Sequence, residues 1–279
     1  MGTSPATLGK LPAEAFGTLV LPAAPLDLID ALRALPDLTG MCSDAMDELG
    51  LAGAISGSIL RARDPSARIV GRALTVHNVR REENFAAALA SGISMLADVE
   101  AHNLAEPGDV LVLQGVDLIS NMGSILASLA RRQGEIGAIV DGAVRDIDHS
   151  RSIGYPVWSR SVSPITGKWR IETAAVNVPV VICGIPVAPG DLVVADEVGV
   201  CFVPYARAAD VLVAVQRILK YEENRLDQIA AHDRLAGVVR ALHQDVRLKD
   251  RDEPERRVLV EEDHTVDRRE CGKQPGPRR

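Results

Sequence analysis

The residues best suited to chemistry are an arginine and an aspartate that stand side by side, Arg145 and Asp146, shortly after the apolar run at residues 136–140. A short apolar run bounded by glycines is typical of a buried strand. In open α/β sheets, ligands bind at the carboxyl ends of the strands. Successive side chains of an extended segment diverge, so the guanidinium suits a carboxylate and the aspartate suits a divalent cation. The alternative is a charged turn after a strand.

A second candidate lies upstream, in the segment from Asn121 to Leu126, and its expected binding residues are Gly123, Ser124, Ile125 and Leu126. We expect Gly123 to permit an unusual backbone angle directly before a helix. The first N–H groups of a helix have no partner within it, so Ser124, Ile125 and Leu126 would form a small anion site. A substrate carboxylate would fit there. The alternative is an ordinary N-capped helix that begins after a glycine turn.

The elements that must position these clusters are strands with helices between them, which predicts an α/β fold. Ser43 is expected as the N-cap of one short helix and Gly50 as its C-terminal stop. A Pro-Gly-Asp turn before an aliphatic strand occurs at residues 107–109 and again at 189–191, and we interpret these as two similar turns rather than a repeat. We expect helices at residues 26–35, 43–49, 84–96, 125–132, 147–153 and 208–242, strands at 69–79, 110–113, 136–140, 192–195 and 199–203, and another strand that starts at 157.

Composition narrows the class of protein. The chain has 279 residues, 47% of them hydrophobic, and a net charge of -7, so neither nucleic acid nor an anionic membrane surface is an expected partner. Only 3% of residues are aromatic, which leaves few stacking platforms for single-stranded nucleic acid. No apolar run is long enough to span a membrane. Four cysteines without a CxxC pair indicate reduced thiols, and we expect a cytoplasmic protein without a signal peptide.

The common catalytic motifs are missing from the sequence. It contains no GxxxxGK[ST] loop, no GxGxxG after the first strand, no HExxH and no GxSxG. The six histidines are scattered without metal-ligand spacing. Nucleotide-dependent and serine-hydrolase functions therefore lose their main support.

Several segments together resemble the RraA-like family. They are GRALTV at residues 71–76, PGDVLVL at 107–113, GAIVDGAVRDIDHSRSIGYPVWSR at 137–160, and VNVPVVICGIPVAPGDLVVADEVGVCFVP at 176–204. The DGxxRD run within the third segment is the most specific part. The resemblance implies an αββα sandwich with a swivelling β/β/α-type core, assembled as a homotrimer or a homohexamer. It also implies an active site in a cleft between neighbouring subunits.

The family includes class II pyruvate aldolases that act on 4-hydroxy-4-methyl-2-oxoglutarate and 4-carboxy-4-hydroxy-2-oxoadipate. By this resemblance, Arg145 holds the pyruvate carboxylate and Asp146 anchors Mg²⁺ or Mn²⁺, mainly through waters. The backbone N–H groups at Gly123, Ser124, Ile125 and Leu126 bind pyruvate. The small-molecule substrate would be a 2-oxo acid, and oxaloacetate decarboxylation would be a side activity.

Three departures from the family pattern affect substrate choice. Ser124 stands where an acidic residue or glycine is expected, and Gln114 where many relatives have aspartate. The aldolases also use an acidic residue of the adjacent subunit, for which the candidates here are Glu197, Glu222 and Glu223.

Three alternatives to the aldolase remain open at this stage. One is a non-catalytic regulator that binds an RNA-degrading enzyme, and another is a different metal-dependent lyase. A methyltransferase that acts on a quinone precursor lacks the expected glycine-rich nucleotide loop. We expect residues 1–25 to be an N-terminal arm, 26–215 the catalytic domain, and 216–279 a C-terminal helix with a charged, partly disordered tail.

Overall fold

The structure of the protein, a computed structural model, describes residues 7–231 together with 235, 237 and 239. The chain divides into two compact units, residues 1–220 and 221–279. The sheet and the candidate site belong to the first unit. Helix α7, Ala208–Ala230, continues into the second.

Some expectations lie beyond this part of the chain. The disorder expected in part of the charged tail falls outside the described residues, and so does most of the expected helix beyond residue 230. The division into an arm, a catalytic domain and a tail stays a prediction.

A mixed sheet is the centre of the first unit. Its long strand β3, Ile69–Arg80, pairs in parallel with β4, Asp109–Gln114, and β4 pairs in parallel with β6, Gly137–Val144. β6 in turn pairs in parallel with β7, Val157–Val162. β4 and β6 are short aliphatic runs buried on both faces over most of their length, as is typical of parallel strands covered by other elements. The predicted α/β class is confirmed.

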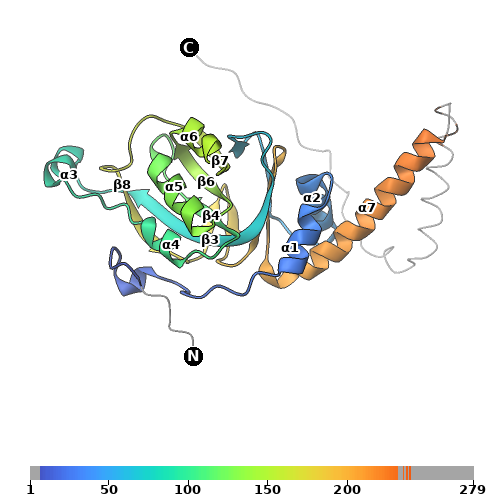
Figure 1. Cartoon of the computed structure of the whole chain (residues 1–279), viewed down its shortest axis with the longest axis horizontal. Coiled ribbons are helices and arrows are strands. Elements are labelled where there is room, and N and C mark those ends of the chain that lie inside the picture. The colour runs from blue at the N-terminus through green and yellow to red at the C-terminus, as the bar shows by residue number, and fades with distance from the viewer. Residues whose placement is uncertain (1–6, 232–234, 236, 238, 240–279) are drawn as a thin grey trace, which may run out of the picture. The chain divides into compact units, whose positions relative to one another are not determined.

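Different elements cover the two faces of these strands. On one face, α4 (Val99–Leu104) and α5 (Ser124–Gln133) pack against β3, β4 and β6, as Figure 1 shows. On the other face lies the hairpin of β9 (Val180–Ile182) and β10 (Ile185–Val187). The carboxyl ends of the parallel strands are therefore held between a helical layer and a hairpin.

The sheet continues beyond β3 through antiparallel strands. β11 (Leu192–Ala195) and β12 (Gly199–Val203) follow β3. Helices α1 (Leu26–Arg33) and α2 (Leu38–Glu48) and the first turns of α7 cover them with an aliphatic core. The remaining elements are η1 Ala13–Ala15, β1 Ala54–Ser56, β2 Arg61–Ala62, α3 Phe85–Ser91, β5 Ser120–Met122, α6 Ile147–Ser152, β8 Ile171–Val176 and η2 Tyr205–Arg207.

Two helix boundaries differ from prediction. Ser43 lies inside α2 and is not its N-cap, because the helix begins at Leu38. The first turn of α2 is satisfied from a distant segment instead: the Thr39 N–H and hydroxyl donate to the Asp196 carboxylate at 3.0 and 2.6 Å. The helix expected at residues 84–96 ends at Ser91, where Gly92 adopts a left-handed conformation with φ 69°.

The two Pro-Gly-Asp turns share one local geometry. Asp109 accepts the Glu106 N–H at 2.8 Å, and Asp191 accepts the Ala188 N–H at the same distance. A carboxylate that bonds an amide three residues earlier closes a turn and directs the chain into the following strand.

Within the described residues, no helix has the length and apolarity to cross a membrane.

Candidate active site

Strand β6 delivers Arg145 and Asp146 to the carboxyl end of the parallel sheet. The strand ends at Val144, and the Arg145 N–H donates to the Met122 carbonyl at 3.0 Å. Asp146 then adopts a left-handed conformation, with φ 55° and ψ 40°, immediately before α6. Aspartate is one of the few residues other than glycine that tolerate this conformation, and here it turns the chain away from the sheet.

The two candidate clusters are in direct contact. The Ser124 N–H at the start of α5 donates to Asp146 Oδ2 at 2.9 Å, and Arg145 Nε lies 3.6 Å from the same oxygen. Both charged side chains are partly open to solvent, with 42% of Arg145 and 38% of Asp146 exposed. The strand end and the helix start therefore form one site.

Gly123 is required for this contact, although not for the predicted reason. Its φ of -148° is extended backbone that any residue adopts, so the expected unusual angle is wrong. The space around it explains the glycine instead. A Cβ at this position would lie 2.7 Å from Asp146 Oδ2 and 3.0 Å from Arg145 Nε. Only a residue without a side chain lets the carboxylate approach the start of α5 this closely.

The bond to the helix amide sets the charge of Asp146. It is the main reason that the pKa of Asp146 lies below its usual value, and the neighbouring charges of Arg145 and His149 act in the same direction. The side chain is therefore a carboxylate at neutral pH. Because it is at a helix N-terminus, the helix dipole also favours the ionised form.

A cleft of about 260 Å³ opens over the start of α5. Ser94 and Leu96 line it from the segment before α4, and residues 166–168 line it from the segment between β7 and β8. Five of the six predicted site residues also line it: Gly123, Ser124, Ile125, Leu126 and Arg145. The sixth, Asp146, is joined to this lining through its bond with Ser124.

Asn121 opens the second candidate segment, and it supports the site in a way that was not predicted. Its side chain is buried, and its Nδ2 donates to the carbonyls of Val116, Ile119 and Ala143 at 2.8, 3.0 and 3.2 Å. Its Oδ1 accepts the Val116 N–H at 2.9 Å. These bonds fix the segment that leads into Gly123 against β6. Gly142 leaves room for this amide, since a Cβ there would lie 2.5 Å from Asn121 Nδ2. No pattern in the sequence indicates this contact.

Comparison with known proteins decides the family. A sequence profile described as Aldolase/RraA matches residues 39–202, which is more than half of the chain. The chain belongs to the RraA-like family. This RraA-like protein is 31% identical over 204 residues to a Halalkalibacterium halodurans protein with the provisional name 4-hydroxy-4-methyl-2-oxoglutarate aldolase, and the alignment covers 72% of this chain and 88% of that one.

Two solved structures resemble this RraA-like protein. An uncharacterized protein from Pseudomonas syringae pv. tomato has a TM-score of 0.64 and 28% identity, and the match covers 78% of this chain and 98% of that one. Streptomyces coelicolor RraAS2, described as an unusual member of the RNase ES inhibitor RraA protein family, has a TM-score of 0.60 and 27% identity, with coverage of 73% and 96%. The predicted RraA-like fold is confirmed.

The residues of this RraA-like protein fit the divalent cation that class II aldolases use. Asp146 offers one ionised, partly exposed carboxylate, and no group of three or more His, Cys, Asp or Glu with the arrangement of a metal site occurs among the residues described. Mg²⁺ keeps several waters and is commonly bound through one or two carboxylates. A single carboxylate suits that mode of binding and does not suit a cation held entirely by protein ligands.

The family departures lie in different places. Ser124 is in the cleft, whereas Gln114 faces the hairpin, where its Oε1 accepts the Val181 N–H at 2.8 Å. Glu197 is exposed in the turn between β11 and β12, and Glu222 and Glu223 belong to the second unit. Glu197 does not line the cleft of its own chain. The contribution of these three glutamates to a neighbouring copy stays a prediction.

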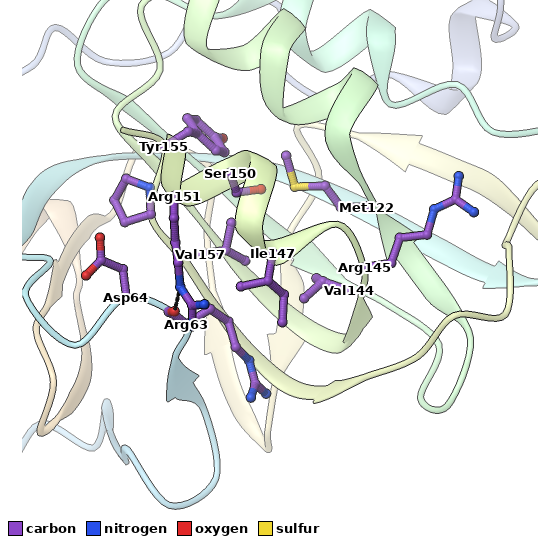
Figure 2. Close-up of a pocket in the computed structure, with 11 residues that line it drawn as sticks. Arg63, Asp64, Met122, Val144, Arg145, Ile147, Ser150, Arg151, Tyr155 and Val157 are labelled. Atoms are coloured by element: carbon purple, nitrogen blue, oxygen red, sulfur yellow. Dashed lines mark hydrogen bonds between the residues drawn. The ribbon is translucent and has the colours of Figure 1, made fainter. Parts of the chain in front are cut away.

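A second hollow lies beside the cleft, between the end of β6, α6 and the start of β7. Figure 2 shows that its lining combines apolar side chains such as Ile147 and Val157 with charged ones such as Arg63, Asp64 and Arg151. The Arg145 side chain extends away from these residues. The hollow's volume of about 10 Å³ is close to the smallest that holds one water. It is a packing gap and too small for an organic acid.

Proposed function

We propose that this RraA-like protein is a divalent-metal-dependent class II aldolase. Its substrate would be a 4-hydroxy-2-oxo acid of the 4-hydroxy-4-methyl-2-oxoglutarate type, and its products pyruvate and a second 2-oxo acid. Oxaloacetate decarboxylation would accompany this activity. The observation that carries the proposal is the contact between Ser124 and Asp146, which joins a guanidinium, a carboxylate and a helix N-terminus beside one cleft.

Each group has a separate task in binding the pyruvate half of the substrate. Arg145 pairs with the C1 carboxylate, because a guanidinium matches the two oxygens of a carboxylate. The N–H groups of Ile125 and Leu126, at the open end of α5, donate to the same half of the substrate. Asp146 holds Mg²⁺ or Mn²⁺. The cation supplies Lewis-acid stabilisation of the negative charge that develops on the 2-oxo oxygen.

Cleavage breaks the C3–C4 bond. The C4 hydroxyl loses its proton and becomes a carbonyl, the electron pair of the broken bond stays on C3, and C3 then takes up a proton to give pyruvate. Within the described lining of the cleft, no carboxylate or imidazole is present to remove the hydroxyl proton. We assign that step to solvent or to an acidic residue of a neighbouring copy, with assembly as a homotrimer or homohexamer.

Pyruvate release is the decisive assay. It should be measured from 4-hydroxy-4-methyl-2-oxoglutarate and from oxaloacetate with Mg²⁺, with Mn²⁺ and with EDTA. We expect metal-dependent turnover in the wild type and at least a 100-fold loss in Arg145→Ala and Asp146→Ala. Arg132→Ala, at the exposed far end of α5, is the control for loss of one positive charge.

The same assay tests the alternative function. RraAS2 is described as a member of an RNase-inhibitor family. A wild-type chain that releases no pyruvate with either metal would favour a non-catalytic regulator that binds an RNA-degrading enzyme. Near-native turnover in either site variant would show that the proposed site is not the active site.

The expected assembly needs its own measurement. Light scattering after size exclusion measures the number of chains in it.

A further inference from the structure

A third hollow lies at the end of the sheet opposite the cleft. Its volume is about 450 Å³, against about 260 Å³ for the cleft. Ile69 opens β3, Ile136 directly precedes β6 and Pro156 directly precedes β7, and all three line it. These are the amino ends of strands that run in parallel, whereas the cleft lies at their carboxyl ends. The proposed function does not use this hollow.

Three arginines from distant parts of the chain line this third hollow, which we call the arginine hollow. Arg33 is in the last turn of α1, Arg68 directly precedes β3, and Arg131 is in the last turn of α5. Among the described residues of the lining, Asp64 alone has a carboxylate. The described lining therefore has a surplus of two positive charges, in a chain whose net charge is -7.

Most of this positive charge is not paired within the protein. Among the described residues, no carboxylate lies within 4.0 Å of the Arg68 or the Arg131 guanidinium. Arg68 donates to the Leu35 carbonyl instead. Arg33 pairs with Asp30, but that carboxylate is 73% exposed and does not line the arginine hollow. The guanidiniums of Arg68 and Arg131 therefore keep most of their donors for an anion from solution.

Asp64 is not paired with any of the three lining arginines. Its Oδ1 accepts the Ser66 N–H at 3.0 Å and the Ser66 hydroxyl at 2.7 Å. Arg63 and Arg151 line the small neighbouring hollow together with Asp64, as Figure 2 shows. The pKa of the Arg63 guanidinium is below its usual value, first because of burial and then because of the positive charges of Arg61 and Arg151. Positive charge is thus crowded beside the arginine hollow, and an anion would offset it.

We propose that the arginine hollow binds a small organic anion that carries at least two phosphate or carboxylate groups on a short carbon frame. A guanidinium forms paired hydrogen bonds with either group. The volume is within the range of roughly 300–1,000 Å³ that is typical of small-molecule sites, and Ile69 and Ile136 offer apolar contact to the frame. The described lining has no aromatic side chain on which a nucleic-acid base could stack. This inference does not rest on the proposed function.

Calorimetric titration of the full chain without added metal ion tests this site. The probes are citrate, which has three carboxylates, and fructose 1,6-bisphosphate, which has two phosphates. We expect at least one of them to bind, and the tighter one identifies the charged group that the site prefers. Arg68→Met and Arg131→Met should each weaken that binding by about tenfold or more, since hydrogen bonds to a charged group are lost. Failure of both anions to bind at millimolar concentration would overturn the inference.

Arg132→Met is the matched control, because Arg132 shares the last turn of α5 with Arg131 and does not line the arginine hollow. It should leave the affinity unchanged. An equal loss in Arg132→Met would show an effect of net charge alone and would overturn the inference. An Arg131→Met chain that loses stability in urea yet keeps its affinity would show that Arg131 serves the end of α5, where a cation is favourable, and would overturn it as well.

Two further titrations locate the anion. Arg145→Ala removes the guanidinium of the cleft and should leave the affinity unchanged, so a loss there would place the anion in the cleft and overturn the inference. A short single-stranded RNA tests the other use of an arginine cluster. RNA binding by a chain that binds neither small anion would assign these arginines to nucleic acid and would also overturn it. Pyruvate release is not measured here, so a failure of the aldolase proposal leaves this test intact.

Discussion

Replacing Gly123 with alanine tests whether the contact between β6 and α5 controls activity. The new Cβ would lie 2.7 Å from Asp146 Oδ2 and 3.0 Å from Arg145 Nε. Non-bonded heavy atoms are at their optimum roughly 3.5–4.0 Å apart, so the carboxylate must withdraw by about 0.5–1 Å. The backbone itself accepts alanine, because φ is -148°. The effect therefore comes from the contact alone.

The expected effects on activity and stability differ in size. Withdrawal of the carboxylate lengthens the Ser124–Asp146 bond, which is 2.9 Å in the wild type, beyond a useful distance. A misplacement of about 1 Å in a reacting site costs roughly 100-fold in rate. The Asp146 side chain is 38% exposed, so the loss in unfolding free energy should be about 1 kcal/mol or less. We expect kcat/KM to fall by about 10- to 100-fold with little change in Tm.

The assay is pyruvate release from 4-hydroxy-4-methyl-2-oxoglutarate, with urea unfolding measured on the same samples. Gly40→Ala is the matched control, because a Cβ at Gly40 in α2 meets no atom within 4 Å. It should keep full activity and gain about 0.5–1 kcal/mol of stability. A Gly123→Ala enzyme whose kcat/KM stays within twofold of wild type would show that the close approach of Asp146 is not needed.

Three further predictions concern neighbouring groups. Asn121→Ala leaves several backbone groups without partners, and urea unfolding should show a loss of about 2–4 kcal/mol. Burial and, after it, the charge of Asp141 raise the pKa of the Cys183 thiol to about 11. Mass spectrometry should therefore show that native Cys183 reacts slowly with iodoacetamide at pH 8, and that it reacts faster in Asp141→Asn. The pKa of Asp146 is lower in the folded protein than its usual value of 3.8. The bond of the carboxylate therefore stabilises the fold fully above pH 3.8, and this stabilisation is lost as the pH falls through the folded pKa. In acid unfolding curves, the stability difference between wild type and Asp146→Asn should shrink as the pH falls below 3.8.

The parts of the fold that could be predicted are those whose signals are local. β3, β4 and β6 contain the aliphatic runs from which strands were predicted, and each is a strand. The start of α2 could not be predicted, because its capping carboxylate, Asp196, is supplied from after β11. β8 was missed for a similar reason. The segment before α4 is held by bonds between Thr173 of β8 and the backbone of Met95 and Ala97, which no local pattern reveals.

The residues of the site also differ in whether a local sequence signal reveals them. Arg145 and Asp146 could be found because an apolar strand ends beside them, and the amides at Ser124 because a glycine precedes a helix. That the two clusters touch depends on the pairing of β5 with β6. Residues 166–168 line the cleft, and they are joined to β5 by the bridge between Thr166 and Ser120, two residues far apart in the sequence.

The two departures from the family pattern have different physical consequences. At Gln114, an amide oxygen accepts the Val181 N–H, and a carboxylate oxygen could accept the same bond, so this exchange leaves the hairpin in place. At Ser124, a neutral side chain lines the cleft where an acidic one is expected, and Arg145 and Lys168 are then the charges of the described lining. An acid at this position would attract both cations and repel an incoming carboxylate. Serine removes that competition, so the Arg145 guanidinium stays available for a substrate carboxylate.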